Sequence, residues 1–91
     1  MYVMISKYLV PLDEVDKVRD EHLAFLDGLA KQGKLVIAGR QTPPVGGLVM
    51  IDAETEEEAR ELMSGDPYLA KGLAEYTATG FRPSLGRLTD V

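Results

Sequence analysis

The sequence predicts an α+β domain in which two helices cover one face of a four-stranded antiparallel sheet. Four segments have the composition of strands, and two longer segments repeat their apolar residues at helical spacing. Their order along the chain is βαββαβ, which is the ferredoxin-like arrangement. Right-handed crossovers bring both helices to the same face of the sheet. A length of 91 residues fits a single domain.

The first predicted strand covers residues 2–10, and apolar side chains occur on both of its alternating sides. This pattern is typical of a central strand with both faces covered. Pro11 ends the strand, and Asp13 is the expected N-cap of the first helix. That helix is expected over residues 13–32 and ends at Gly33, because glycine commonly terminates helices in the left-handed conformation.

The middle of the chain is expected to form two strands, at residues 34–40 and 48–52. Between them lies the pair Pro43-Pro44, which lacks backbone N–H groups and cannot join a regular ladder. We interpret this segment as a rigid connection between the two strands.

The second helix is expected to begin after Thr55, which forms a capping box with Glu58. In such a box Thr55 caps the helix, and the Glu58 side chain reaches back to the backbone N–H of Thr55. The helix ends near Gly65, and residues 66–72 restart the chain as a short turn or helical piece. Residues 73–81 are rich in strand-favouring Tyr, Thr and Phe. The domain is expected over residues 1–83, with a tail at 84–91.

Composition and charge exclude several classes of function. The net charge of −5 argues against a nucleic-acid partner, which needs clustered Lys and Arg. No apolar run approaches the roughly 18 residues that span a bilayer, and the N-terminus does not read as a signal peptide. The absence of cysteine excludes disulfides, thiolate metal ligands and a cysteine nucleophile. We therefore expect a cytoplasmic protein that contacts neither nucleic acid nor membrane.

The face of the sheet opposite the helices predicts a partner. The first and third strands are apolar on both sides, so the face without helices also needs cover. A second copy of the same sheet is the simplest cover, and two-fold dimers are the commonest symmetric assemblies. We expect a homodimer through stacked sheets.

His22 and Asp66 are the candidate catalytic residues. His22 lies in the apolar stripe of the first predicted helix, and Asp66 follows the apolar face of the second at helical spacing. An imidazole and a carboxylate that both leave water can satisfy each other by pairing. Such a pair orients one tautomer of the imidazole and leaves the other nitrogen free to act as a base.

Other interpretations of the same residues stand beside this one. A lone histidine on an apolar face is more often a core residue than a catalyst. Asp66 before Pro67 also suits the cap of a new helical turn. Arg19 lies near His22 on the helix and is a candidate for holding a substrate carboxylate or phenolate, with a surface pair to Glu14 or Glu21 as the alternative.

Two hydroxyl residues complete the candidate pocket. Ser6 and Tyr8 share one face of the first strand and would bind substrate if that face points toward the helices; packing is the alternative role for both.

Several short motifs resemble the YciI-like (YCII-related) family. They are Arg19-x-x-His22, glycines at 33, 39 and 47, Glu58-Ala59, and Asp66-Pro67-Tyr68 with Gly72. The resemblance covers roughly residues 2–83. It implies a dimeric α/β barrel in which His22 and Asp66 are active-site residues. Most members have no assigned reaction, and some relatives eliminate chloride from hydroxylated aromatic rings. Arg40 departs from the pattern, because many relatives have proline there, and it is expected to reshape or charge the pocket.

These observations lead to one hypothesis with two rivals. The hypothesis is a cofactor-independent acid–base enzyme of the lyase or isomerase type that acts on a small metabolite. The first rival is a non-catalytic module that binds a small molecule. The second is a structural dimer in which the two residues form a buried polar pair. A metal site is disfavoured, because His22 and Asp66 supply only two of the three protein ligands that a catalytic zinc usually takes.

Overall fold

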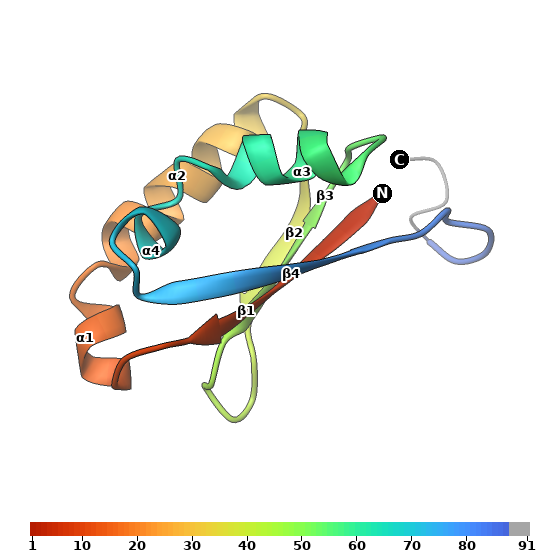
Figure 1. Ribbon diagram of the computed structural model, residues 1–91. Coiled ribbons are helices and arrows are strands. Elements are labelled where there is room, and N and C mark those ends of the chain that lie inside the picture. The colour runs from red at the N-terminus through yellow and green to blue at the C-terminus, as the bar shows by residue number, and fades with distance from the viewer. Residues whose placement is uncertain (88–91) are drawn as a thin grey trace.

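The computed structural model describes residues 1–87 and confirms the α+β fold (Figure 1). The sheet contains four strands in the order β2-β3-β1-β4, and every neighbouring pair is antiparallel. The strands are β1 (Tyr2–Tyr8), β2 (Leu35–Arg40), β3 (Gly47–Ile51) and β4 (Ala74–Gly80). This is the topology that the βαββαβ order predicts.

The helices all lie on one side of the sheet, and Figure 1 shows the other side without any helix. They are α1 (Leu12–Asp16), α2 (Arg19–Lys31), α3 (Glu56–Met63) and α4 (Pro67–Ala70). The short α4 corresponds to the helical piece expected after Gly65. The side of the sheet that faces α2 and α3 therefore contains the core and every candidate site residue.

The first helix differs from the prediction of one continuous segment over residues 13–32. It is interrupted at residues 17–18, where Val18 has φ −112° and ψ 1°, so α1 and α2 are separate. The two parts pack into different clusters. Val15 of α1 packs with Tyr68 and Ala74, whereas Leu26 and Leu29 of α2 belong to the main core. No glycine or proline marks the interruption in the sequence.

Of the four sequence signals expected at the helix ends, two are confirmed and two are wrong. Gly33 has φ 74° and terminates α2 as predicted, and Thr55 caps α3 by accepting a hydrogen bond from the Glu58 backbone N–H at 3.1 Å. Asp13 is not the N-cap of the first helix, because it lies inside α1, after Pro11. The Glu58 carboxylate accepts from the Glu54 backbone N–H at 3.3 Å and not from that of Thr55.

The main core lies between the sheet and the helices α2 and α3. Side chains from alternating strand positions, such as Met4 and Val49, meet Leu26 and Leu29 of α2 and Met63 of α3, and all are at most 5% exposed. This alternation follows from the pleat, which sends successive side chains to opposite faces. The same alternation places Ser6, Tyr8 and Tyr76 on the helix side of the sheet.

The opposite face of the sheet carries exposed apolar side chains at its centre. The register aligns Val3 with Met50 and Ile5 with Leu48, and it aligns Ile37 of β2 with Met50. Ile37 is 61% exposed and Leu48 is 41% exposed. We refer to these five residues as the open face.

The connection between β2 and β3 closes tightly against β1. Gly46 packs against the β1 backbone so closely that a Cβ atom there would lie 1.9 Å from the Ser6 carbonyl oxygen, so only glycine fits. The Tyr8 backbone N–H donates to the Val45 carbonyl at 2.9 Å. The Pro43-Pro44 connection thus holds the end of β1, where Tyr8 is located.

Residues 81–87 contain neither helix nor strand, and residues 88–91 of the expected tail lie outside the described residues. Within the described part of the chain, no helix is both long enough and apolar enough to cross a membrane.

Candidate active site

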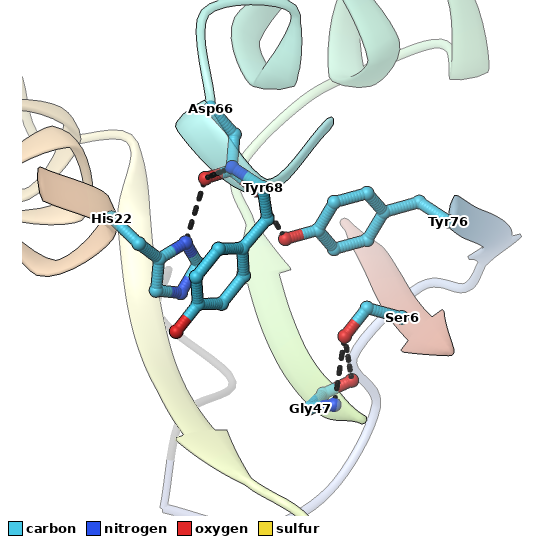
Figure 2. A network of polar contacts seen from close by, with 6 residues as sticks. All are labelled: Ser6, His22, Gly47, Asp66, Tyr68 and Tyr76. Atoms are coloured by element: carbon cyan, nitrogen blue, oxygen red, sulfur yellow. Dashed lines mark hydrogen bonds and ion pairs between the residues drawn. The ribbon is translucent and has the colours of Figure 1, made fainter. Parts of the chain in front are cut away.

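The centre of the site is a short contact between His22 and Asp66. His22 comes from the first turn of α2, and Asp66 is the N-cap residue of α4. The His22 Nδ1 atom lies 2.7 Å from the Asp66 Oδ1 atom, and the two side chains are 12% and 0% exposed. Figure 2 shows the pair beside Tyr68. Two residues that are 44 positions apart are thus brought together between α2 and α4.

Asp66 also acts as a helix cap, as the alternative interpretation expected. Its Oδ1 atom accepts a hydrogen bond from the Tyr68 backbone N–H at 3.2 Å, and Pro67 occupies the first position of α4. The cap and the contact with His22 use the same oxygen atom. The cap therefore fixes the carboxylate in the orientation that reaches the imidazole.

A third hydrogen bond to Asp66 comes from β4. The Tyr76 hydroxyl donates to the Asp66 Oδ2 atom at 2.5 Å (Figure 2). Burial, followed by the hydrogen bond to Asp66 and the charge of that carboxylate, raises the pKa of Tyr76 well above its ordinary value. Tyr76 therefore keeps its proton and remains a donor. We call His22, Asp66 and Tyr76 the inner network.

The carboxylate determines which nitrogen of His22 carries a hydrogen. An ionised carboxylate can only accept hydrogen bonds, so the contact requires the hydrogen on Nδ1. The Nε2 atom of a neutral imidazole then has a free lone pair. The arrangement leaves Nε2 able to accept a proton from another molecule.

Tyr68 holds the imidazole ring in place. Its ring lies parallel to that of His22, with 3.9 Å between centroids and 7° between planes. Tyr68 is only 2% exposed, and burial raises the pKa of its phenol. Stacking on one face and the hydrogen bond at Nδ1 together leave the His22 ring little freedom to rotate.

A cavity of about 140 Å³ adjoins this histidine. It lies between α2 and the strands β1, β2 and β3. Its wall includes the five pocket residues that the sequence singled out: Ser6, Tyr8, Arg19, His22 and Arg40. Asp66 does not belong to the wall; it is fully buried and hydrogen-bonds three residues of the wall, His22, Tyr68 and Tyr76.

Arg40 is fixed at the rim of this cavity by two contacts. Its Nη2 atom donates to the Asp16 Oδ1 atom at 2.6 Å, and its Nε atom donates to the Tyr8 hydroxyl oxygen at 3.1 Å. The hydrogen bond with Asp16 raises the pKa of Arg40 further above its already high value. We call Asp16, Arg40 and Tyr8 the rim network.

Arg19 differs from Arg40, because it is exposed and makes no hydrogen bond or ion pair within residues 1–87. The two surface partners considered for it are bonded to lysines. Glu14 pairs with Lys17 at 3.0 Å and Glu21 pairs with Lys71 at 3.1 Å. Arg19 is thus an exposed cation in the cavity lining, with no hydrogen-bond or ion-pair partner in the part of the chain that the structure describes.

Ser6 lines the cavity but its hydroxyl is already bonded to β3. The Ser6 Oγ atom accepts from the Gly47 backbone N–H at 2.7 Å and donates to the Gly47 carbonyl at 3.3 Å (Figure 2). A side chain on Gly47 would also collide with the Gly39 carbonyl oxygen, 2.8 Å from the Cβ position. The geometry favours a role for Ser6 in joining β1 to β3.

Three residues of the site were not predicted as site residues from the sequence: Asp16, Tyr68 and Tyr76. Tyr68 and Tyr76 were read only as motif and strand residues, although their inward positions on α4 and β4 bury a phenol that needs a partner. Asp16 carried no signal, because its partner Arg40 is 24 positions away. Within residues 1–87 there is no cluster of three or more His, Cys, Asp or Glu side chains that would hold a metal ion.

Comparison with known proteins assigns the chain to a family. The chain is similar in structure to 5-chloro-2-hydroxyhydroquinone dehydrochlorinase (TftG) from Burkholderia phenoliruptrix AC1100, solved in complex with 2,5-dihydroxybenzoquinone. That likeness has a TM-score of 0.73 at 20% identity and covers 92% of this chain and 96% of the other. In sequence, this chain is 35% identical over 74 residues to the uncharacterized protein YjpA of Bacillus subtilis (strain 168). The match covers 77% of this chain and 87% of YjpA. The model of the YCII-related domain matches residues 1–82, and the chain therefore belongs to the YCII-related family.

Proposed function

We propose that this protein is a cofactor-independent acid–base enzyme of the lyase or isomerase type. The observation that carries the proposal is the 2.7 Å contact of Asp66 Oδ1 with Nδ1 of His22, which lies in the wall of a cavity. In this proposal, His22 removes a proton from the substrate through Nε2. Asp66 keeps the imidazole in one tautomer and stabilises its positive charge after the transfer.

The cavity restricts the size of the substrate. Its volume of about 140 Å³ is close to the roughly 150 Å³ that holds one benzene molecule in an engineered protein cavity. The fold neighbour binds 2,5-dihydroxybenzoquinone, which is also a single six-membered ring. We infer a substrate of one oxygenated ring or a metabolite of similar size.

The charges at the cavity favour an anionic or easily ionised substrate. Arg19 has no partner within the described residues, and the proposal assigns it to a substrate carboxylate or phenolate. Arg40 is already neutralised by Asp16, so its part is to shape and polarise the rim. Removal of a proton from such a substrate leaves an electron pair that either expels a neighbouring leaving group or shifts within the ring, after which His22 returns the proton to a different atom of the substrate. The first outcome is a lyase reaction and the second is an isomerisation.

A direct test uses the chlorinated hydroquinone that the fold neighbour is named for. The purified protein is incubated with 5-chloro-2-hydroxyhydroquinone, and chloride release is measured with an ion-selective electrode. We expect activity in the wild type, its loss in His22→Gln, and its retention in Lys31→Gln, which changes only an exposed ion pair. Binding without chloride release or any product would favour the non-catalytic module.

The contact between His22 and Asp66 has its own test. Heteronuclear NMR of the imidazole nitrogens distinguishes the two tautomers. We expect the hydrogen on Nδ1 alone in the wild type and a mixture of tautomers in Asp66→Asn. A wild-type ring that carries its hydrogen on Nε2 would remove the free base and contradict the proposed mechanism.

We also propose that two copies stack through the open face to form a homodimer. The open face presents apolar side chains that no helix of the described chain covers, and an apolar patch of this kind usually marks an interface. Gly39 and Leu48 line both the cavity and a hollow on the open face. A partner seated there would lie next to the site.

The dimer is tested by sedimentation velocity on the wild type and on Leu48→Lys. We expect a dimer for the wild type and a folded monomer for the variant, because a buried lysine at the centre of an apolar interface is costly. Lys7→Glu, at the polar end of the same face, is the matched control. A wild type that stays monomeric at all protein concentrations would contradict the stacked-sheet dimer.

A further inference from the structure

The rim network places a cation against a phenol at the edge of the cavity. Arg40 ends β2, Asp16 ends α1 and Tyr8 ends β1, so three elements meet at one guanidinium group. Two different nitrogen atoms of Arg40 donate to the two partners, at 2.6 Å and 3.1 Å. The guanidinium is therefore fixed in orientation as well as in position.

The hydroxyl of Tyr8 is an acceptor in this network, and its own hydrogen has no acceptor within residues 1–87. The hydroxyls of two other cavity residues differ in this respect. Tyr76 donates to Asp66, and Ser6 donates to the Gly47 carbonyl. A phenol that accepts from a cation becomes a stronger donor, because the positive charge polarises its O–H bond. Tyr8 is thus a polarised donor that lines the cavity.

Tyr8 and His22 both make ring contacts with Tyr68. The His22 ring stacks on Tyr68 with 3.9 Å between centroids, and the Tyr8 ring meets Tyr68 edge-on at 6.0 Å. The proposed base His22, from α2, and the polarised donor Tyr8, from β1, both line the same small cavity.

We propose that Tyr8 donates a hydrogen bond to the substrate oxygen that becomes negatively charged when His22 removes a proton. Arg40, held by Asp16, is the positioning residue that acts through Tyr8. This inference rests on the proposed acid–base function. The bond from carbon or oxygen to hydrogen breaks in the substrate, the proton goes to His22 Nε2, and the electron pair moves onto the substrate oxygen. Tyr8 keeps its own proton throughout, so the ligand of this subsite is an enolate or a phenolate.

Arg40 and Arg19 have different roles in this proposal. Asp16 neutralises Arg40 and keeps it from leaving the rim to pair with a substrate anion directly. Arg19 has no such tether in residues 1–87 and is exposed in the cavity lining. The oxygen that is charged as an enolate or a phenolate meets Tyr8, whereas a second anionic group of the substrate, such as a carboxylate, meets Arg19.

The test uses para-nitrophenol as the probe, since its ionised form absorbs visible light and its neutral form does not. Spectrophotometric titration gives both the affinity for the phenolate and the ionised fraction of the bound probe. We expect Tyr8→Phe to bind the phenolate roughly 10- to 100-fold more weakly, which is the usual loss of one hydrogen bond to a charged group. We expect a smaller loss of the same sign in Arg40→Met and Asp16→Asn.

Three control variants locate the bound oxygen. Tyr2→Phe removes a hydroxyl from the same side of β1 but outside the cavity, and we expect wild-type binding. Equal binding by the wild type and Tyr8→Phe would overturn the proposal. A loss confined to Tyr68→Phe or to Arg19→Gln would also overturn it, because the phenolate would then lie at the other tyrosine or at Arg19.

The same variants separate this proposal from the proposed function. The imidazole tautomer in Tyr8→Phe should match the wild type, because Tyr8 makes no hydrogen bond to His22 or Asp66. A single Nδ1–H tautomer with unchanged phenolate binding would refute the role of Tyr8 alone. A mixture of tautomers in the wild type, with weaker phenolate binding by Tyr8→Phe, would refute the proposed base and leave Tyr8 as a binding donor.

Discussion

The inner network and the rim network are each built around one aspartate, but the two carboxylates have different surroundings. Asp66 is fully buried and accepts three hydrogen bonds, from His22, Tyr68 and Tyr76. Asp16 has a side chain that is 44% exposed and it accepts one hydrogen bond, from Arg40. The comparison indicates that the two carboxylates contribute very differently to stability. A buried carboxylate is costly to disturb, whereas a carboxylate at the rim can be changed for a functional purpose.

The largest expected effect is that of Asp66→Ala. The change removes the partner of three buried donors at once, and breaking a buried ionic network costs about 3–5 kcal/mol. Urea denaturation measures this loss. Asp27→Ala is the matched control, because Asp27 pairs with Lys31 at the surface, and it should cost less than about 1 kcal/mol. Similar losses in both variants would mean that the inner network contributes nothing beyond an ordinary surface pair.

A smaller effect is expected for Tyr76→Phe. This change leaves Asp66 Oδ2 buried without its donor, which costs about 1–3 kcal/mol. The bonds from His22 and Tyr68 to the other oxygen atom remain. The urea midpoint should therefore fall between those of the wild type and Asp66→Ala. A variant as stable as the wild type would show that the Tyr76 hydroxyl does not support the carboxylate.

The inner network should also appear in the alkaline stability of the protein. The pKa of Tyr76 is raised in the folded state, so above pH about 10 the unfolded chain loses this proton while the folded chain keeps it. The stabilisation is fully present below pH 10 and is lost as the pH rises further. The slope for one such group is at most about 1.4 kcal/mol per pH unit.

Unfolding in urea between pH 9 and 12 measures this slope. Tyr68 adds a slope of the same sign, because burial raises the pKa of Tyr68 as well. Tyr76→Phe should therefore be less sensitive to alkali than the wild type, yet not insensitive. Below pH 9 the two curves should run parallel. Identical curves over the whole range would contradict the raised pKa of Tyr76.

The smallest effect on stability is expected for Asp16→Asn. An ion pair this exposed contributes about 0–1 kcal/mol, so the urea midpoint should hardly move. The same variant should weaken para-nitrophenolate binding, because Arg40 loses the group that orients it toward Tyr8. This combination would distinguish the rim network most clearly from the inner one. A large loss of stability would instead make the rim network structural.

The sequence predicted the fold because the fold depends on periodic patterns. Strand-favouring segments and helical periodicity predicted the order of the elements, and Gly33 and Thr55 marked helix ends correctly. The side of β1 that faces the helices was left open, because apolar residues lie on both of its sides. His22 was found because it interrupts an apolar stripe, and Asp66 because it follows one. The interruption of the first helix at residues 17–18 could not be predicted, because no glycine or proline marks it and the cluster of Val15 with Tyr68 and Ala74 joins segments far apart in the sequence.

The sequence by itself thus determined the order of strands and helices, the apolar faces of the helices, and the two polar residues, His22 and Asp66, that break or follow those faces. Only the tertiary structure decided which atoms meet: Tyr76 with Asp66, Arg40 with Asp16, and Arg19 with no partner in residues 1–87. The physical reason is that the two kinds of information depend on different separations along the chain. Periodicity is a local property of the backbone, whereas a hydrogen bond requires atoms from distant segments to lie within about 3 Å of each other. The packing of the whole domain sets that distance.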